Sequence, residues 1–370
     1  MRPLARHPAR RLAALLALAA VLACGAQKVP QGHRAVPATG QPTQSEPALR
    51  ATPGPPRQAG RPTAAINVEP SMRPWRYVGA NPDSWWDPAN GQAAADTELA
   101  LIEELGSPML RIEFPWYLIE PARGSYDWSR ADHVVQAAQA HHVALLPIVV
   151  WTPAWAAAQP NQPPRAADFE AFMRSLVTRY RSSIHAWELW NEPNLSRYWS
   201  GTDAQYVSAV LTPGYQVVHA VDRSAQVVLG GPSGADVKWL RGVYQWGGAD
   251  SFDVAAFHDY VPPGQIQRDA GFVVKVLDGQ GQGWKPIWLG EYGLEEGPQD
   301  TQQQVLMRSV LGTSGPISLA AWYNLRDDYA MTCCPAQIVV RGGWGLVEHD
   351  GQTRKAGFAT MRDLVAGRSG

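Results

Sequence analysis

The stretch HAWELWNEPN, residues 185–194, is the part of this chain that decides its fold. It joins a short apolar run, in which a Trp lies on either side of Glu188, to the polar residues Asn191 and Glu192. Such a run is typical of a strand buried inside a parallel barrel, and functional side chains follow these strands at their carboxyl ends. The stretch therefore predicts a barrel strand that ends at a functional rim, and Glu192 is the first candidate for chemistry.

Apolar strands and amphipathic helices alternate along the chain on both sides of this stretch. We predict eight strand–helix repeats, the number that a closed (β/α)8 barrel requires. The predicted strands are residues 77–80, 109–113, 143–150, 185–190, 227–230, 253–257, 287–290 and 317–322. The predicted helices are residues 93–105, 129–141, 166–180, 204–221, 237–246, 266–277, 301–312 and 355–365. Pro213 predicts a break or kink in the fourth helix, and Ser129 is expected to cap the second.

The length and composition of the chain suit one large domain. The sequence has 370 residues, of which 45% are hydrophobic, and a (β/α)8 barrel needs about 250 residues. The formal net charge of −1 creates no long-range field for a polyanion, so we exclude nucleic acid as a partner. The sequence contains no CxxC pair, no HExxH motif and no Gly-rich phosphate loop, so we expect neither a metal nor a cofactor. We expect a monomer.

The first 24 residues have the features of an export signal. Four arginines precede the apolar run 12–23, which is too short to span a bilayer. Residues 21–25, Val-Leu-Ala-Cys-Gly, resemble a bacterial lipobox, in which the cysteine thiol carries lipid after cleavage. We therefore expect a lipoprotein anchored to the membrane through Cys24, with ordinary signal cleavage nearby as the alternative.

Residues 25–65 have the composition of a disordered tether. They are rich in Pro, Gln, Thr and Ala and show no apolar periodicity, so they cannot bury enough surface to offset the entropy of ordering. The tether would hold a barrel domain, residues 66–370, away from the membrane. We expect an exported protein at the bacterial cell envelope, or otherwise a periplasmic or secreted one.

A second carboxylate follows the predicted seventh strand. The segment PIWLGEYG, residues 286–293, is an apolar strand that ends in Gly290, Glu291, Tyr292 and Gly293. In a closed barrel, the carboxyl ends of the fourth and seventh strands lie at the same rim, so Glu192 and Glu291 are expected to face one site. Glu295 and Glu296 compete with Glu291, but they lie past the strand end in a polar stretch.

The WNEPN and GEYG segments resemble the fourth-strand and seventh-strand motifs of the clan A retaining glycoside hydrolases, (β/α)8 enzymes that include families 5 and 39. The resemblance implies that Glu291 is the nucleophile, that Glu192 is the acid/base, and that Asn191 binds the sugar 2-hydroxyl. The alternative is that both glutamates are solvated rim charges. The acid/base role predicts that burial or the neighbouring carboxylate raises the pKa of Glu192.

Further residues fall where this resemblance places substrate-binding groups. Arg111 resembles the arginine that holds the nucleophile ionised, and an ion pair with Glu113 or Glu188 is its structural alternative. His258 and Tyr260 follow the sixth strand, where the clan has groups near the nucleophile, and a packed aromatic rim is the alternative.

Aromatic side chains after the predicted strands are candidates for stacking on sugar rings, although each is equally suited to a core. Trp322, at the end of the eighth strand, resembles a tryptophan that lines the central sugar subsite in the clan, and Trp151 follows the third strand. The other candidates are Trp85, Trp86, Trp116, Trp155, Tyr198 and Trp199.

The expected function is that of a retaining β-glycosidase acting on an oligo- or polysaccharide, with a carbohydrate as the partner and no cofactor. An exo-acting enzyme similar to β-xylosidases is the near alternative. The alternative from another class is a carbohydrate-binding lipoprotein on an inactive barrel. A transglycosylase would use the same residues and differ only in excluding water.

Overall fold

The computed structural model describes residues 54–68, 85–86, 91–296, 301–327, 331–333, 338–340, 343–348 and 350–368. These residues belong to the second of two compact units of the chain, residues 48–370. The export signal and most of the tether lie outside the described residues, as does the segment 77–80 that we predicted as the first strand. Within the described part, no helix combines the length and the apolar character that crossing a membrane requires.

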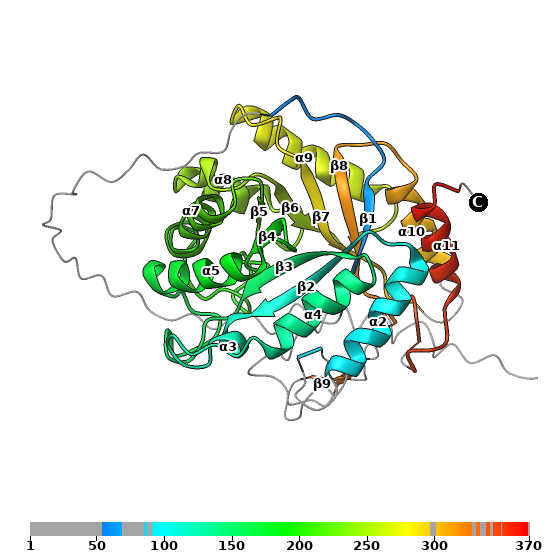
Figure 1. The fold of residues 1–370 in the computed structure, drawn as a ribbon. Helices are drawn as coiled ribbons and strands as arrows, with labels where there is room; N and C mark the ends of the chain where they lie inside the picture. The colour runs from blue at the N-terminus through cyan, green and yellow to red at the C-terminus, as the bar shows by residue number, and fades with distance from the viewer. Residues whose placement is uncertain are drawn as a thin grey trace, which may run out of the picture. The chain divides into compact units, whose positions relative to one another are not determined.

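Eight parallel strands form the barrel, in the order β5-β4-β3-β2-β1-β8-β7-β6 (Figure 1). They are β1 Thr63–Asn67, β2 Met109–Pro115, β3 Ala144–Val150, β4 Ala186–Leu189, β5 Gln226–Leu229, β6 Ala255–His258, β7 Ile287–Tyr292 and β8 Ile317–Trp322. The ring closes between β5 and β6 through a parallel bridge of Val228 and Val254. The predicted (β/α)8 barrel is therefore confirmed.

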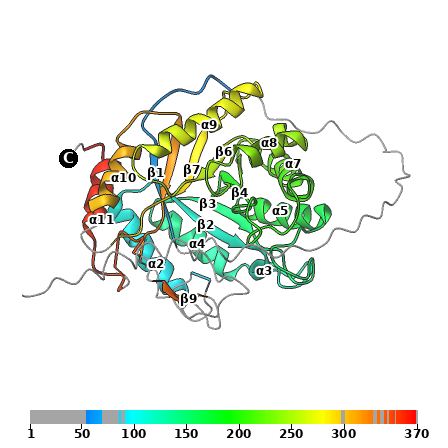
Figure 2. The same ribbon diagram turned by 180° about the vertical axis from the view of Figure 1, so that it is seen from behind.

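The helices lie outside the ring of strands, as both ribbon views show (Figures 1 and 2). They are α2 Gly91–Leu105, α3 Trp116–Ile119, α4 Ser129–Ala140, α5 Ala166–Tyr180, α6 Asp203–Tyr206, α7 Thr212–Val221, α8 Val237–Gln245, α9 Gln265–Gly279, α10 Thr301–Leu311 and α11 Ala356–Val365. A short antiparallel pair, β9 Met331–Cys333 and β10 Ile338–Val340, follows β8.

Our prediction of residues 77–80 as the first strand was wrong, because Thr63–Asn67 occupies the place of the first strand. β1 pairs with β8 on one side and with β2 on the other, and it begins within the last residues of the predicted tether. Two of its four buried residues are alanine and it has no aromatic side chain, so only Thr63 and Ile66 indicate a strand. Small side chains are what a crowded barrel interior accepts.

The chain between β4 and β5 contains the break that Pro213 predicts. Residues Val207–Leu211 form a π-helix, and Pro213 lies in the first turn of α7. A proline has no N–H and its ring collides with the carbonyl four residues earlier, so the preceding turn widens. The prediction of Ser129 as a cap was wrong: Ser129 is the first helical residue of α4, and its backbone N–H donates to the carboxylate of Asp127.

The barrel interior is filled by small side chains around one large one. Its buried cluster consists of Ala65, Leu146, Ala186, Val228, Val254, Ala256, Trp288, Leu319 and Ala321. Trp288 on β7 fills the space that the alanines leave, and a second, larger cluster packs the strands against the helices. The interior is therefore a packed core, and the space for chemistry lies at its carboxyl end.

Removing the large interior side chain tests this description. We expect Trp288→Ala to lower the free energy of unfolding by about 3–5 kcal/mol, because the alanines that surround Trp288 cannot close the cavity. Urea unfolding followed by circular dichroism measures this change. Trp246→Ala is the matched control, since Trp246 is exposed, and a similar loss in both variants would contradict the assignment.

Candidate active site

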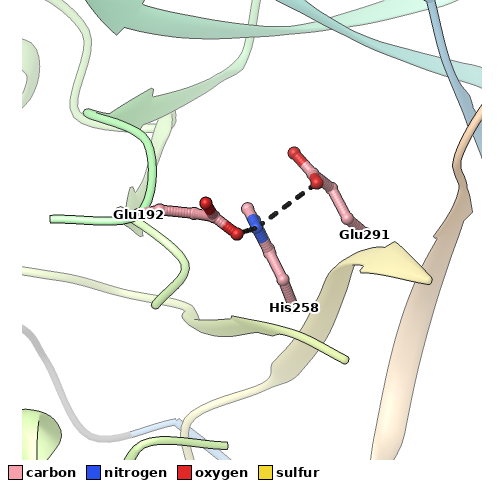
Figure 3. A group of neighbouring side chains, drawn as sticks. All are labelled: Glu192, His258 and Glu291. Carbon is pink, nitrogen blue, oxygen red and sulfur yellow. Dashed lines mark hydrogen bonds and ion pairs between the residues drawn. The ribbon is translucent and has the colours of Figure 1, made fainter. Parts of the chain in front are cut away.

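The polar residues predicted at the rim come together at the carboxyl end of the barrel (Figure 3). Glu192 lies just past β4, His258 ends β6, and Glu291 lies near the end of β7. One carboxylate oxygen of Glu192, one ring nitrogen of His258 and one carboxylate oxygen of Glu291 all lie within 4.8 Å of one another. The fold thus brings the two glutamates, which are far apart in sequence, into one site.

A buried arginine connects the nucleophile candidate to the interior of the barrel. The Arg111 Nη1 donates to Glu291 Oε1 at 2.7 Å, while Nε and Nη2 donate to the two oxygens of Glu188 at 2.6 and 2.9 Å. The ion pair with Glu188, which we gave as the structural alternative, and the contact with Glu291 therefore exist together. Glu113, the other partner considered, accepts a hydrogen bond from the Trp151 ring.

Two asparagine side chains also accept hydrogen bonds from Arg111. Nη1 donates to Asn67 Oδ1, and Nη2 donates to Asn191 Oδ1, both at 3.0 Å. Burial by itself would lower the pKa of Arg111, but the carboxylates of Glu188 and Glu291 outweigh it and raise the pKa above its ordinary value. Arg111 is therefore a permanent cation beside Glu291.

The contacts of His258 define which of its ring nitrogens carries the proton. Nε2 lies 3.1 Å from Arg111 Nη2, whose two N–H groups also face Glu188 and Asn191; a guanidinium can only donate, so Nε2 shares one of these N–H groups as an acceptor. The proton therefore lies on Nδ1, which is 3.2 Å from Glu192 Oε1 and 3.5 Å from Glu291 Oε2. The Nδ1 of His258 thus lies between the two carboxylates, as Figure 3 shows, and donates to Glu192.

Two glycines leave the room that His258 needs. A Cβ on Gly231 would lie 2.6 Å from His258 Nε2, and one on Gly290 would lie 3.0 Å from the same atom. The first distance is shorter than any van der Waals contact, so only glycine fits at residue 231 while the ring keeps its place.

Glu192 is held by a second arginine that the sequence analysis did not identify. Arg197 Nη2 donates to Glu192 Oε2 at 2.9 Å, and the side chain of Arg197 is 51% exposed, whereas that of Glu192 is 4% exposed. Burial would raise the pKa of Glu192, but the hydrogen bond from His258 and the charge of Arg197 lower it below its ordinary value. Our expectation of a raised pKa is therefore wrong for this state, because His258 and Arg197 stabilise the carboxylate.

Tyr260 and two other aromatic residues border Glu291. The Tyr260 hydroxyl donates to Glu291 Oε2 at 2.6 Å, and 39% of the residue is exposed. Burial of its hydroxyl and the negative charge of Glu291 raise the pKa of Tyr260. Its ring meets those of Tyr323 and Trp344 edge to face, at centroid distances of 6.1 and 5.3 Å. These partly exposed rings lie at the rim.

Trp322 and Trp151 are fully buried in this structure. The Trp322 Nε1 donates to the carbonyl of Trp344 at 3.1 Å, and the Trp151 Nε1 donates to Glu113 Oε2 at 3.0 Å. Both residues support the rim from below, and neither presents an open ring face. Of the other aromatic candidates, Trp85, Trp86, Trp116, Tyr198 and Trp199 are also buried, and Trp155 is partly exposed.

Strained backbone concentrates where β3 and β4 reach the rim. Trp151, Trp190 and Glu192 have φ angles of 72°, 77° and 41°, in a region that side chains other than glycine rarely adopt. Buried hydrogen bonds hold them there, including those from the Trp190 Nε1 to the Tyr198 carbonyl and from the Glu192 N–H to the Gly231 carbonyl. The strain aims the Glu192 carboxylate at the site.

Glu192, His258 and Glu291 have the spacing of a metal-ligand set, but the positive charges next to them oppose a cation. Guanidinium groups of Arg111 and Arg197 already bind the carboxylates of Glu291 and Glu192. A divalent cation would have to displace both and lie beside their positive charges. The donor set therefore fits carboxylate chemistry better than metal binding.

Glu295 and Glu296, the other nucleophile candidates, lie elsewhere. Glu295 is exposed, and the Glu296 carboxylate accepts a hydrogen bond from the backbone of Gln303 at 2.9 Å. The residues that the sequence analysis missed are Asn67 and Arg197. Asn67 was missed because its strand was missed, and Arg197 had only one signal, a charge in the loop that follows Glu192.

Comparisons with known sequences give one partial match. Residues 100–210 match the family model described as Glycosyl hydrolase family 10. This range contains the NEPN segment and Glu192 but ends before Glu291. No curated protein sequence matches the chain.

Solved structures of glycoside hydrolases have the same fold. A family 39 glycoside hydrolase of Bacteroides cellulosilyticus is 18% identical, with a TM-score of 0.61, and the match covers 83% of this chain and 64% of that one. This chain thus spans a little less than two thirds of that protein. A family 39 β-xylosidase of Caulobacter crescentus is 18% identical, with a TM-score of 0.62 and coverages of 84% and 73%. A xylanase of Thermotoga petrophila is 12% identical, with a TM-score of 0.57 and coverages of 82% and 94%.

A methyl group at residue 231 tests the packing around His258. In Gly231→Ala the imidazole has to move, so we expect histidine ¹H–¹⁵N spectra to lose the signal of a single Nδ1-protonated ring. Overpacking should also lower the free energy of unfolding by about 1–3 kcal/mol. Gly271→Ala is the control, because a Cβ there meets nothing within 4 Å; an unchanged His258 signal in Gly231→Ala would refute the described packing.

A second titratable pair lies behind the site and makes stability depend on pH. Asp259 is buried next to His258, and burial together with the carboxylate of Asp269 raises the pKa of Asp259 to about 7. The group is protonated in both the folded and unfolded states below about pH 4. Its contribution to stability is therefore lost as the pH rises from 4 through 7.

Replacing the Asp259 carboxyl should remove this loss of stability at rising pH. We expect Asp259→Asn to gain stability relative to the unmodified protein by roughly 2–4 kcal/mol between pH 4 and pH 8. Urea unfolding at a series of pH values measures the difference. Asp363→Asn, at a surface position paired with Arg368, should show no such trend, and parallel curves for Asp259→Asn would contradict the raised pKa.

Proposed function

We propose that this clan A (β/α)8 glycoside hydrolase cleaves β-O-glycosidic bonds of an oligo- or polysaccharide with retention of configuration. One observation carries the proposal: a carboxylate oxygen of Glu192 and one of Glu291 lie within 4.8 Å of each other. Retaining enzymes need carboxyl groups about 5–5.5 Å apart, whereas inverting enzymes leave about 6.5–9.5 Å for a water molecule. The short distance between these oxygens supports the retaining arrangement.

In the first step, Glu291 attacks the anomeric carbon. A carboxylate oxygen forms a bond to that carbon while the bond to the glycosidic oxygen breaks, and the proton of Glu192 passes to the departing oxygen. The product is a glycosyl ester of Glu291 and a free leaving group. Arg111, which is 2.7 Å from Glu291, holds the nucleophile in position through a charge-assisted hydrogen bond.

In the second step, water replaces the protein at the anomeric carbon. Glu192, now a carboxylate, takes a proton from the water as its oxygen bonds to carbon, and the ester bond to Glu291 breaks. The sugar leaves with its original configuration after two inversions. Both glutamates return to their starting protonation states.

Other polar groups of the site position these reactants. Arg111 holds the Oδ1 of Asn191, so the amide NH₂ of Asn191 is directed away from it and is the donor for the sugar 2-hydroxyl. The Tyr260 hydroxyl orients Glu291 through the 2.6 Å hydrogen bond. His258 donates to Glu192 and maintains the separation of the two carboxylates.

The aromatic residues have two different roles in this proposal. Tyr260, Tyr323 and Trp344 offer partly exposed rings beside Glu291 for contact with sugar faces. Trp322 and Trp151 are buried and position other parts of the site. Trp322 holds Trp344 through a hydrogen bond to its carbonyl, and Trp151 fixes the end of β3. A rearrangement on substrate binding would be needed before either could stack on a sugar.

Several alternatives exist for the substrate and for the reaction. A β-xylosidase and an exo-β-1,4-mannosidase are among the structures of similar fold, which supports an exo-acting alternative. An inactive carbohydrate-binding barrel is disfavoured by the intact network around both glutamates. A transglycosylase would release the same intermediate to a sugar acceptor. We propose export and lipid attachment at Cys24 from the sequence of the first 25 residues.

Trapping the intermediate tests the mechanism. We expect 2-deoxy-2-fluoro β-glycosides of xylose, glucose, mannose and galactose, and of their β-1,4-linked disaccharides, each with a dinitrophenyl leaving group, to include one that labels the peptide containing Glu291. Mass spectrometry of the digested protein identifies the labelled residue. Glu291→Ala should lose the label, and Glu192→Ala should keep it, because dinitrophenolate leaves without a proton.

The control variant is Glu295→Ala, which removes an exposed glutamate from the same loop and should label like the unmodified protein. With leaving groups that require protonation, Glu192→Ala should lower kcat by about 10²–10⁴-fold. A label on another residue, or a first product of inverted configuration by NMR, would refute the retaining mechanism.

A further inference from the structure

The ion pair of Arg197 and Glu192 places a cation directly on the acid/base residue. The Arg197 guanidinium bonds the outer oxygen, Oε2, at 2.9 Å, while His258 bonds the inner oxygen, Oε1, at 3.2 Å. Arg197 is half exposed and Glu192 is buried, so the guanidinium lies between Glu192 and the solvent. The Tyr198 ring supports it, with Arg197 Cζ 4.8 Å from the ring centroid.

This cation lies on the leaving-group side of the site. The sugar that is transferred must lie over Glu291, and the oxygen that Glu192 protonates joins this sugar to the leaving group. The inner oxygen of Glu192 faces His258 and Glu291, whereas the outer oxygen faces Arg197. A group that contacts Arg197 is therefore part of the leaving group or next to it.

The pair also opposes the first chemical step. Glu192 must carry a proton in order to give it away, but Arg197 stabilises its carboxylate form. The other charged or titratable groups facing Glu192 are His258, Glu291 and Tyr260. Of these, Glu291 opposes ionisation of Glu192 through its negative charge. His258 and Arg197 both stabilise the carboxylate form of Glu192, so transfer of Arg197 to another partner would remove one of these two groups and favour protonation.

We propose that Arg197 binds an anionic group on the leaving-group side of the substrate, and that this exchange of partners releases Glu192 to act as the acid. The inference rests on the proposed function and extends it to the substrate class. The anion is a carboxylate, sulfate or phosphate on the sugar next to the scissile bond. The site thus selects an acidic glycan.

An anion is required because a neutral substrate could not replace the carboxylate. A guanidinium separated from a buried partner keeps its charge, and sugar hydroxyls are weak acceptors compared with Glu192. A carboxylate or sulfate on the substrate accepts the same forked pair of N–H groups and restores the balance of charge. Glu192 then remains buried beside Glu291, and burial raises its affinity for a proton.

Matched substrates and variants test the inference in the full-length protein. The substrates are 3-carboxyphenyl, 3-sulfophenyl and neutral 3-carbamoylphenyl β-glycosides of the sugars in the labelling panel. We expect kcat/KM to be about tenfold or more higher for one of the anionic leaving groups, the effect of one charged hydrogen bond. Comparison of the carboxylate with the sulfonate separates uronate-type from sulfate-type substrates.

The variants are Arg197→Gln, Arg197→Lys and the control Arg179→Gln. Arg197→Gln should reduce the ratio of anionic to neutral kcat/KM to about one, and Arg197→Lys should give an intermediate ratio, because it keeps the charge but not the fork. Arg179 is also paired with a carboxylate and followed by a tyrosine, yet it lies on α5 away from the rim. Its replacement should leave the ratio unchanged.

A pH profile distinguishes this role from a merely structural one. The acid works only when protonated, so kcat/KM falls as the pH rises through the pKa of Glu192. Because Arg197 lowers that pKa, Arg197→Gln should move the falling limb to higher pH for the neutral substrate. A structural role would leave the limb in place.

Each outcome decides the question. Equal kcat/KM for anionic and neutral substrates in the unmodified protein would overturn the inference and leave the retaining mechanism intact. An anionic preference that persists in Arg197→Gln would assign the anion to another group and also overturn it. If no glycoside is cleaved and no fluoro-sugar labels the protein, the proposed function fails and the inference fails with it.

Discussion

The rim of this barrel depends on one buried guanidinium. Arg111 on β2 contacts Asn67 on β1, Glu188 on β4, His258 on β6 and Glu291 on β7, and it also bonds Asn191, which directly precedes Glu192. A charge so deeply buried is tolerated only when all its donors are paired, so the five partners are fixed in direction as well as in distance. The distance between Glu192 and Glu291 is therefore a consequence of how the barrel satisfies the hydrogen bonds of Arg111.

The two arginines of the site differ in their exposure to solvent, and this difference gives them different roles. Arg111 is enclosed by strands and keeps its partners, which suits a group that holds the Glu291 carboxylate in a fixed position. Arg197 is half exposed on a rim loop and can change its partner at a smaller cost in desolvation. In the proposed mechanism, the surroundings of Glu291 are therefore permanent, whereas those of Glu192 depend on what binds at the rim.

Much of the fold could be predicted because apolar residues recur along the sequence with the clear periods of buried strands and amphipathic helices. The strands from Met109 to Trp322 and the helix Ala166–Tyr180 agree with the predicted positions, since a strand buried on both faces is continuously apolar and a covering helix repeats every three to four residues. β1 could not be predicted, because Thr63–Asn67 is short and rich in alanine and obtains its stability from pairing with β8, some 250 residues later. Missing β1 also meant missing Asn67.

The sequence by itself determined the class of fold, the position of Glu192 and Glu291 at strand ends, and the type of residue at each polar rim position. These follow from local composition, because a strand end and its next residues are adjacent in the chain. Only the tertiary structure decided the separation of the carboxylates, the proton position on His258, the burial of Trp151 and Trp322, and the pairing of Arg197 with Glu192. Each of these depends on which side chains meet across the barrel and on how much water remains between them, and neither quantity is encoded in the spacing of residues along the chain.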